Sequence, residues 1–480
     1  MKNNTPTARY YFHMLIIFLY GLFALALTWP LAASLLTHVP GTPAWAFDEF
    51  TFVWNMWWFK FSLLDLGQTP LHTHYIFYPL GIDLVAYTYN LFDAMIGLPL
   101  QLVCSPPFAS NIALLSAYIL SGYGTYLLVL YLLRPGRRCR PGAGDAPRAG
   151  PPLEYHLAAF IAGCAYAFAA SRMIYAALGH YMLVTVQWFP FALLFFLKTL
   201  RERSYRNPVL AGIFLALLLL VESTFGVFWL FFALVLLAFG FIDARNHAAA
   251  SRSEEETASA PREEPSALQA VWALPSRLAV LGGTAAVLWS PMLAALVRAY
   301  RGGELELSGW GNALHLSADL VGLFTPTALH PLLGAEDWPA HLRAVVEGKA
   351  GFLDVNTVFL GFGLLALALV GTLSLWKRAR AWATGAVLFT ILALGPLLQI
   401  RGQFIFPLDG LLRGHGGAEG VTFPLPFALL HFIPFIKANR APNRFSVTAT
   451  LALAVLAGYG AFFLLSRLSR SKPAIKMLAG

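Results

Sequence analysis

Two adjacent acids, Asp48 and Glu49, stand just beyond the first long apolar stretch of the chain. A carboxylate at the boundary between membrane and water can act as a general base toward a hydroxyl group. Its oxygens can also bind a divalent cation such as Mg²⁺ or Mn²⁺. Acids of this kind are equally common as solvated loop residues. The pair alone therefore leaves catalysis, metal binding and simple solvation open.

A cluster of cations precedes the last apolar segment and contains Lys437, Arg440 and Arg444. Guanidinium groups bind phosphate oxygens bidentately, and a helix N-terminus adds a favourable dipole. Arg440 and Arg444 are four residues apart, so both would face one site if the helix begins early. The alternative is that these side chains extend to lipid headgroups.

Three further polar positions interrupt apolar stretches. His180 follows Gly179 between two helical segments, with Arg172 on the preceding one, and it either binds a phosphate or acceptor or serves as a cap or packing residue. Glu222 lies in a tight turn, where it either joins a site or caps the turn. Asp319 belongs to Ser317-Ala318-Asp319, which is predicted to cap a short helix.

The composition indicates what positions these residues. Of 480 residues, 58% are hydrophobic and only 12% are charged, and the mean hydropathy is +0.64. Such a chain is typical of a bundle of membrane helices. The net charge of +9 sits in short clusters between apolar runs, which indicates topology rather than nucleic-acid binding. Patterns for nucleotide loops, zinc sites and nucleophile elbows are absent from the sequence.

The apolar segments and basic loops predict an all-α polytopic protein with about 10–12 transmembrane helices. The segments lie near 12–36, 89–104, 108–133, 157–177, 181–198, 208–222, 224–242, 278–297, 357–376, 383–400 and 444–466. Basic loops stay cytoplasmic, which places both termini inside and the loops 37–88, 301–356 and 401–443 outside. Segment 89–104 is short and contains Asp93 and Pro99. We expect it to be re-entrant or interfacial, which leaves about ten full crossings.

A charged stretch at 243–276 divides the chain in two and is predicted to be a solvated, partly disordered cytoplasmic linker. Residues 1–242 form an N-terminal transmembrane module, whose outer loop 37–88 contains the acid pair. Residues 277–480 form a C-terminal module. Within loop 37–88, aromatic residues at helical spacing over Trp54 to Leu66 predict a helix in the outer membrane interface.

Together these residues resemble the GT-C superfamily of membrane glycosyltransferases, and more closely the bacterial GT-C-like integral membrane proteins of the YfhO-related type. The resemblance covers most of the chain through short motifs. They are Asp48 with Trp54-Asn55, Ile76-Phe77-Tyr78-Pro79, Gly179-His180, Ser317-Ala318-Asp319 and Arg440-Ala441-Pro442-Asn443-Arg444-Phe445.

The resemblance implies an inverting enzyme at the outer face of a bacterial cytoplasmic membrane. It would transfer a sugar from a polyprenyl phosphate to a glycan, lipid or protein acceptor. Asp48 would deprotonate the acceptor hydroxyl, while Arg440, Arg444 and Arg172 would hold the departing lipid phosphate. Many such enzymes carry a second acid in a later outer loop. The candidates for that second acid here are Glu222, Glu304, Glu306 and Asp319.

Two other classes of function remain open. A transporter or flippase for lipid-linked or anionic solutes would also use many crossings and outer cations, although paired halves typical of transporters are not evident in the sequence. A non-catalytic membrane subunit could retain the same fold. The distance of Asp48 from the cations before the last helix distinguishes an enzyme site from unrelated loop charges.

Overall fold

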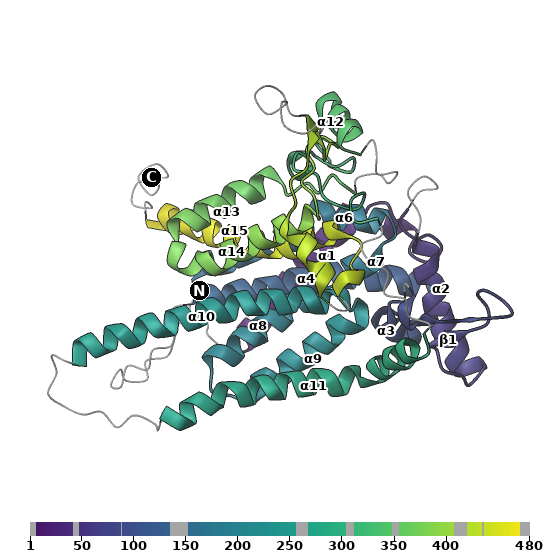
Figure 1. Ribbon diagram of the computed structural model, residues 1–480, viewed down its shortest axis with the longest axis horizontal. Coiled ribbons are helices and arrows are strands. Elements are labelled where there is room, and N and C mark those ends of the chain that lie inside the picture. The colour runs from purple at the N-terminus through teal and green to yellow at the C-terminus, as the bar shows by residue number, and fades with distance from the viewer. Residues whose placement is uncertain are drawn as a thin grey trace.

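The computed structural model describes residues 6–41, 48–87, 89–134, 152–255, 267–303, 312–347, 355–407, 420–433 and 436–470. Long helices lie side by side along one axis (Figure 1). Within these residues, seven helices are long and apolar enough to cross a membrane. The protein is therefore an all-α polytopic membrane protein, as its composition predicts. Ten crossings, the lower end of the predicted range, would require α9 (Arg206–Val221), α13 (Phe362–Ser374) and α14 (Trp376–Ala393) to cross as well.

In Figure 1 the elements of the N-terminal half lie through the middle of the bundle and at its right-hand end. They are α1 (Pro6–Leu27), η1 (Leu31–Ala33), α2 (Glu49–Lys60), η2 (Phe61–Asp65), β1 (His72–Thr73), β2 (Ile82–Asp83), η3 (Leu84–Ala86), α3 (Leu91–Gln101), α4 (Pro106–Leu133), α5 (Leu153–Ala167), α6 (Ala170–Ala177), α7 (Tyr181–Val184), α8 (Trp188–Arg201), α9 (Arg206–Val221) and α10 (Thr224–Glu255). β1 and β2 pair antiparallel, with His72 opposite Asp83.

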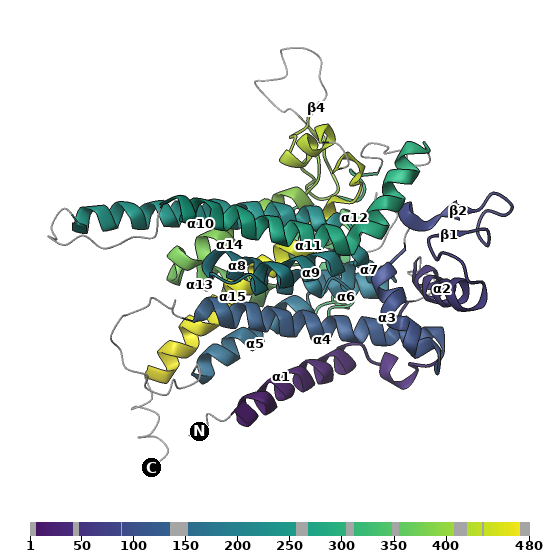
Figure 2. The ribbon, with the colours of Figure 1, turned by 90° about the horizontal axis from the view of Figure 1, so that it is seen from below.

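The C-terminal half adds four long helices and several short elements. They are α11 (Ala267–Arg301), η4 (Gly322–Phe324), α12 (Asp337–Glu347), α13 (Phe362–Ser374), α14 (Trp376–Ala393), β3 (Phe406–Pro407), β4 (Gly420–Val421), η5 (Pro426–Phe432), η6 (Ile436–Ala438), η7 (Pro442–Arg444) and α15 (Phe445–Arg470). The start of α1 and the end of α15 lie at the end of the bundle opposite α2 and α12 (Figures 1 and 2).

The segment predicted to be re-entrant corresponds to α3. Its 11 residues span about 16 Å, which is far short of a hydrocarbon core of about 30 Å. Both views place α3 beside α2 at one end of the bundle (Figures 1 and 2). Asn90 caps the helix, because its side-chain oxygen accepts a hydrogen bond from the Asp93 N–H at 3.0 Å. The chain therefore returns to the same end before α4 begins.

The predicted linker 243–276 differs from the structure. α10 continues to Glu255 and α11 begins at Ala267, so much of this stretch is helical. The reason is local, since the segment is rich in alanine, arginine and glutamate, which have high helix propensity. Only residues 256–266 of the predicted linker fall outside the described part of the chain.

The predicted interfacial helix is α2 together with η2, but its aromatic residues pack more closely than headgroup anchors would. Trp58 is buried, and it stacks on Trp54 with ring centroids 5.8 Å apart. Tyr75, from the hairpin that follows, lies 5.4 Å from Trp58. The Trp58 indole N–H also donates to the Pro70 carbonyl at 3.1 Å. These contacts fix the β1–β2 hairpin against α2.

Helices α13 and α15 pack against each other at glycine residues. A Cβ at Gly371 of α13 would lie 2.1 Å from the Leu456 carbonyl oxygen of α15. A Cβ at Gly460 of α15 would lie 2.0 Å from the Leu367 carbonyl oxygen of α13. The two backbones therefore approach as closely as small residues allow, which is a common way to join helices where lipid competes for apolar contacts.

We expect Gly460→Ala to destabilise the protein by about 1–3 kcal/mol, because the added methyl group collides with backbone that cannot move aside cheaply. The measurement is the unfolding temperature in detergent. Gly363→Ala on α13 is the matched control, since its Cβ meets open space among the described residues. An equal effect of the two substitutions would contradict the proposed close crossing.

Candidate functional site

The acid pair and the histidine turn, about 130 residues apart in the chain, meet at one end of the bundle. The Nε2 atom of His180 lies 3.2 Å from Oδ2 of Asp48. Asp48 is the residue just before α2, yet within the described chain its side chain makes no bond to the N–H groups of that helix. Its carboxylate is thus available to His180, and the neutral imidazole can donate its Nε2–H to it.

Gly179 makes this contact possible. Its backbone has a φ of +72°, and a Cβ there would lie 2.6 Å from the Glu49 backbone nitrogen and 2.7 Å from Glu49 Oε2. A side chain would therefore be strained by the backbone and would also collide with the first turn of α2. Behind this contact Phe52 stacks on Tyr181, with ring centroids 5.6 Å apart. The two segments are held together on both sides of the Asp48 and His180 pair.

The electrostatics of this site favour a neutral histidine. Burial lowers the pKa of His180 to about 4, with Asp48 acting in the opposite direction and the positive charge of Arg444 lowering it further. Burial raises the pKa of Glu49 above its usual value, and the charge of Asp48 adds to that rise. Glu49 is 1% exposed, and its Oε2 has no hydrogen-bond partner among the described residues. Glu49 therefore faces the interior of the protein, whereas Asp48 is half-buried.

The positive charge of Arg444 acts on His180. Its segment is fixed by Asn443, whose N–H donates to the Leu316 carbonyl at 3.1 Å. The Asn443 side chain donates to the Val355 carbonyl at 3.2 Å. Arg444 lies in η7, at the start of the last helix, as the sequence predicts. A cation is thus held near the Asp48 and His180 pair.

The other predicted cations lie differently. Arg440 is exposed, and within the described residues it makes no hydrogen bond or ion pair with protein groups. Lys437 is half-buried in η6. Both belong to the segment that leads to Arg444, so the three cations lie on one stretch of the chain. Their contact with a common ligand stays a prediction.

Arg172 has a different environment from the predicted phosphate contact. Its side chain is fully buried, and its guanidinium donates to Ser121 Oγ at 2.9 Å and to the Val184 carbonyl. Its Cζ lies 4.8 Å from the centre of the Tyr166 ring, a cation–π distance. These groups surround the cation, which gives Arg172 the role of a brace inside the bundle rather than a contact open to ligand.

Two of the four acids predicted as a second catalytic carboxylate, Glu222 and Asp319, bind backbone groups of the fold. Glu222 accepts from the Thr224 hydroxyl at 2.7 Å and from the Thr224 N–H at 3.2 Å, which caps α10. Asp319 is fully buried and accepts from the N–H groups of Val321 and Gly402, each at 2.8 Å. Both carboxylates are thus occupied by backbone donors. Glu304 and Glu306 lie outside the described residues.

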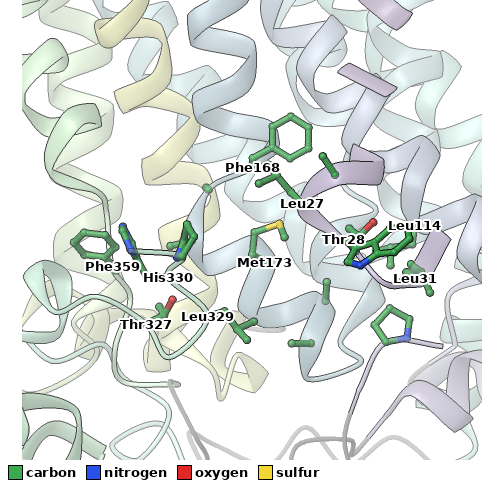
Figure 3. A pocket seen from close by; sticks show the side chains of 18 of the residues that line it. Leu27, Thr28, Leu31, Leu114, Phe168, Met173, Thr327, Leu329, His330 and Phe359 are labelled. Carbon is green, nitrogen blue, oxygen red and sulfur yellow. The ribbon is translucent and has the colours of Figure 1, made fainter. Parts of the chain in front are cut away.

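A large apolar cavity lies among the ends of α1 and α6 and the start of α13, and Asp48, His180 and Arg444 are not among its lining residues. Its volume is about 920 Å³, and side chains including Leu27, Phe168 and Met173 face His330 and Phe359 across it (Figure 3). Ala176 and Ala177 line it immediately before the turn of His180. The cavity can hold an apolar chain, because its lining is mostly aliphatic and aromatic.

The donor set at the acid pair does not match a metal site. Among the described residues, no group of three or more His, Cys, Asp and Glu side chains is placed to hold a metal ion. Glu49 is buried behind Asp48, and the His180 imidazole faces Asp48 itself. The predicted Mg²⁺ or Mn²⁺ therefore has no part in the chemistry described below.

Comparison of the chain with models of known protein families and with curated proteins finds no match. The site thus has to be interpreted from its own geometry. That geometry includes groups that the sequence did not single out. Tyr175 stacks beside the His180 ring, with centroids 6.0 Å apart. His72 pairs with Asp83 at 2.7 Å, a contact that the His72-Thr73-His74 spacing beside a hairpin turn could have suggested.

We expect Gly179→Ala to separate Asp48 from His180 and to lower the unfolding temperature, because the methyl group collides with Glu49. Gly67→Ala is the matched control. Gly67 also has a positive φ, of +61°, but its Cβ meets open space among the described residues. The difference between the two variants measures the collision without the shared backbone strain. Equal losses would show that the Gly179 contact with Glu49 carries no energy.

We expect acid to destabilise the protein through His180. Its pKa is lower in the folded state than the 6.5 of a free side chain, so the unfolded chain binds the proton more readily. The contribution to stability is complete above pH 6.5 and is lost as the pH falls toward about 4. By pH 4.5 the loss amounts to about 2 kcal/mol. Unfolding temperatures measured from pH 7.5 to 4.5 should fall more steeply for the wild type than for His180→Gln; parallel curves would contradict this.

Proposed function

We propose that the protein is an inverting membrane glycosyltransferase that transfers a sugar from a polyprenyl phosphate to a glycan, lipid or protein acceptor. The observation that carries the proposal is the grouping of Asp48, His180 and Arg444 at one end of the bundle. An apolar cavity lined by Ala176 and Ala177, shortly before His180 in the chain, supports the proposal, since a lipid-linked donor needs space for its chain. We further propose about ten crossings and a GT-C-like arrangement in a bacterial cytoplasmic membrane.

The chemistry follows from the positions of these groups. An acceptor hydroxyl oxygen attacks the anomeric carbon of the donor sugar, and its proton passes to the Asp48 carboxylate. The bond between that carbon and the phosphate oxygen breaks with inversion. The neutral His180 holds the Asp48 carboxylate by donating its Nε2–H at 3.2 Å. It adds no positive charge that would make Asp48 a weaker base.

Arg444 acts on the leaving group. The departing polyprenyl phosphate gains negative charge as its bond to the sugar breaks, and a fixed guanidinium nearby stabilises that charge in the transition state. Arg440 and Lys437, on the polypeptide just before it, supply further positive charge for the donor phosphate. In this proposal the lipid chain occupies the cavity that begins at Ala176 and Ala177.

We expect Asp48→Asn to lower sugar transfer by at least about 100-fold while leaving folding intact, because asparagine cannot accept the proton. The assay follows release of polyprenyl phosphate from synthetic polyprenyl-phosphate sugars by the purified protein, with a membrane extract as the source of acceptor. Asp65→Asn is the control, since Asp65 is an exposed acid of the same outer loop.

Wild-type turnover in Asp48→Asn would exclude the proposed base. Movement of intact lipid-linked sugar across reconstituted vesicles, without release of polyprenyl phosphate, would favour a flippase instead. If the wild type neither transfers nor moves the donor, the non-catalytic subunit becomes the better hypothesis.

A further inference from the structure

A second polar cluster lies on the β1–β2 hairpin, apart from the proposed active site. The Nδ1 atom of His72 lies 2.7 Å from Oδ1 of Asp83, its cross-strand neighbour. The Nε2 atom of His72 lies 3.3 Å from Nε2 of His74. From these positions we propose that His72 and His74 form a binding site for a transition-metal dication, with Zn²⁺ as its representative.

The distance between the two nitrogens carries the proposal. Two imidazole nitrogens bound to tetrahedral zinc at 2.0–2.1 Å lie about 3.3 Å apart. A hydrogen bond from N–H to an acceptor is usually 2.7–3.2 Å long. The ring centroids are 4.7 Å apart, farther than the two Nε2 atoms, so the rings turn their Nε2 sides toward each other. Their separation suits a shared metal ion better than a hydrogen bond between the rings.

Asp83 prepares His72 for that role. By accepting the Nδ1–H of His72 it leaves the Nε2 lone pair free for a metal. A carboxylate behind a metal-bound histidine is a recurrent arrangement, because it fixes the tautomer and raises the basicity of the ligand. Asp83 lies on the opposite side of the His72 ring from His74 and thus orients the ligand without binding the ion itself. Water molecules would complete the coordination shell.

The hairpin holds both rings in place. Gly81 has a φ of +73°, and a Cβ there would lie 2.6 Å from the Nδ1 atom of His74, so the turn packs closely against this ring. Tyr75, the next residue, packs on Trp58 of α2. His74 is exposed, which gives an ion from the solvent direct access. A bound metal would link His72 to His74 and make the hairpin more rigid where it packs on Trp58, near the C-terminal end of α2.

The test is zinc binding by the purified full chain. The protein is purified through an affinity tag that contains no histidine, and binding is measured by competition with a chromophoric chelator. We expect about one equivalent of Zn²⁺ to bind the wild type and to be lost in His72→Gln and in His74→Gln. Asp83→Asn should weaken binding by about 10–100-fold, as other partners behind metal ligands do. His341→Gln, which removes an exposed histidine of α12, should bind as the wild type does.

A second measurement guards against misfolded variants. Zinc should raise the unfolding temperature of the wild type and of His341→Gln, since a ligand that binds only the folded state stabilises it. It should leave that of His74→Gln unchanged. The proposal is overturned if the wild type binds no zinc at 100 µM, chosen as roughly the weakest affinity of interest. Retention of the equivalent by the double variant His72→Gln and His74→Gln would overturn it as well.

Discussion

The contact between the Gly179 turn and the first residues of α2 is the constraint on which the candidate site depends. It exists because Gly179 lacks a side chain where Glu49 needs space. With the two segments this close, Glu49 is buried, His180 is shielded from water and Asp48 lies within hydrogen-bond distance of His180. One close backbone approach thus sets the position of the base and the charge of its partner. The pKa shifts of His180 and Glu49 follow mainly from burial rather than from charged pairs.

Arg172 supports the same turn from inside the bundle. Helices α6, α7 and α8 are separated by breaks, which leave backbone carbonyls without helical partners. The Arg172 guanidinium binds one of these carbonyls, at Val184, and reaches the Tyr166 carbonyl at 3.4 Å, where α5 ends. A broken helix inside an apolar bundle needs such partners, because water is not available to satisfy its backbone. A charge that looks catalytic in the sequence thus stabilises the corner from which His180 extends.

Among the described residues, histidine and aspartate pair twice, in two environments with different consequences. The His180 side chain is 21% exposed, and burial holds its imidazole neutral and suited to orienting a base. The His72 pair lies on an exposed hairpin, and its free nitrogen faces a second imidazole. Burial suits the first pair to proton transfer. Exposure and a convergent partner suit the second to an ion. The same residue types serve different chemistry because their surroundings differ.

The membrane class and the helical architecture could be predicted from the sequence, because hydropathy and charge patterns depend on neighbouring residues. Local signals also singled out Asp48, His180 and Arg444 one at a time. The extent of α10 and α11 was missed, since a charged segment can be either solvated coil or exposed helix. Glu222 and Asp319 could not be separated from catalytic acids by sequence, because their partners are backbone groups whose positions depend on the fold.

The tertiary structure decided which of these residues meet. Five α-helices of the described chain lie between Asp48 and His180, and no local pattern encodes a distance of 3.2 Å between the two side chains. The burial of Arg172 likewise depends on helices α4, α5 and α7, which surround it together. The sequence by itself determined that the chain inserts in a membrane and which side chains can do chemistry. Packing determined which of them share one site, because long-range contacts form only when the helices assemble.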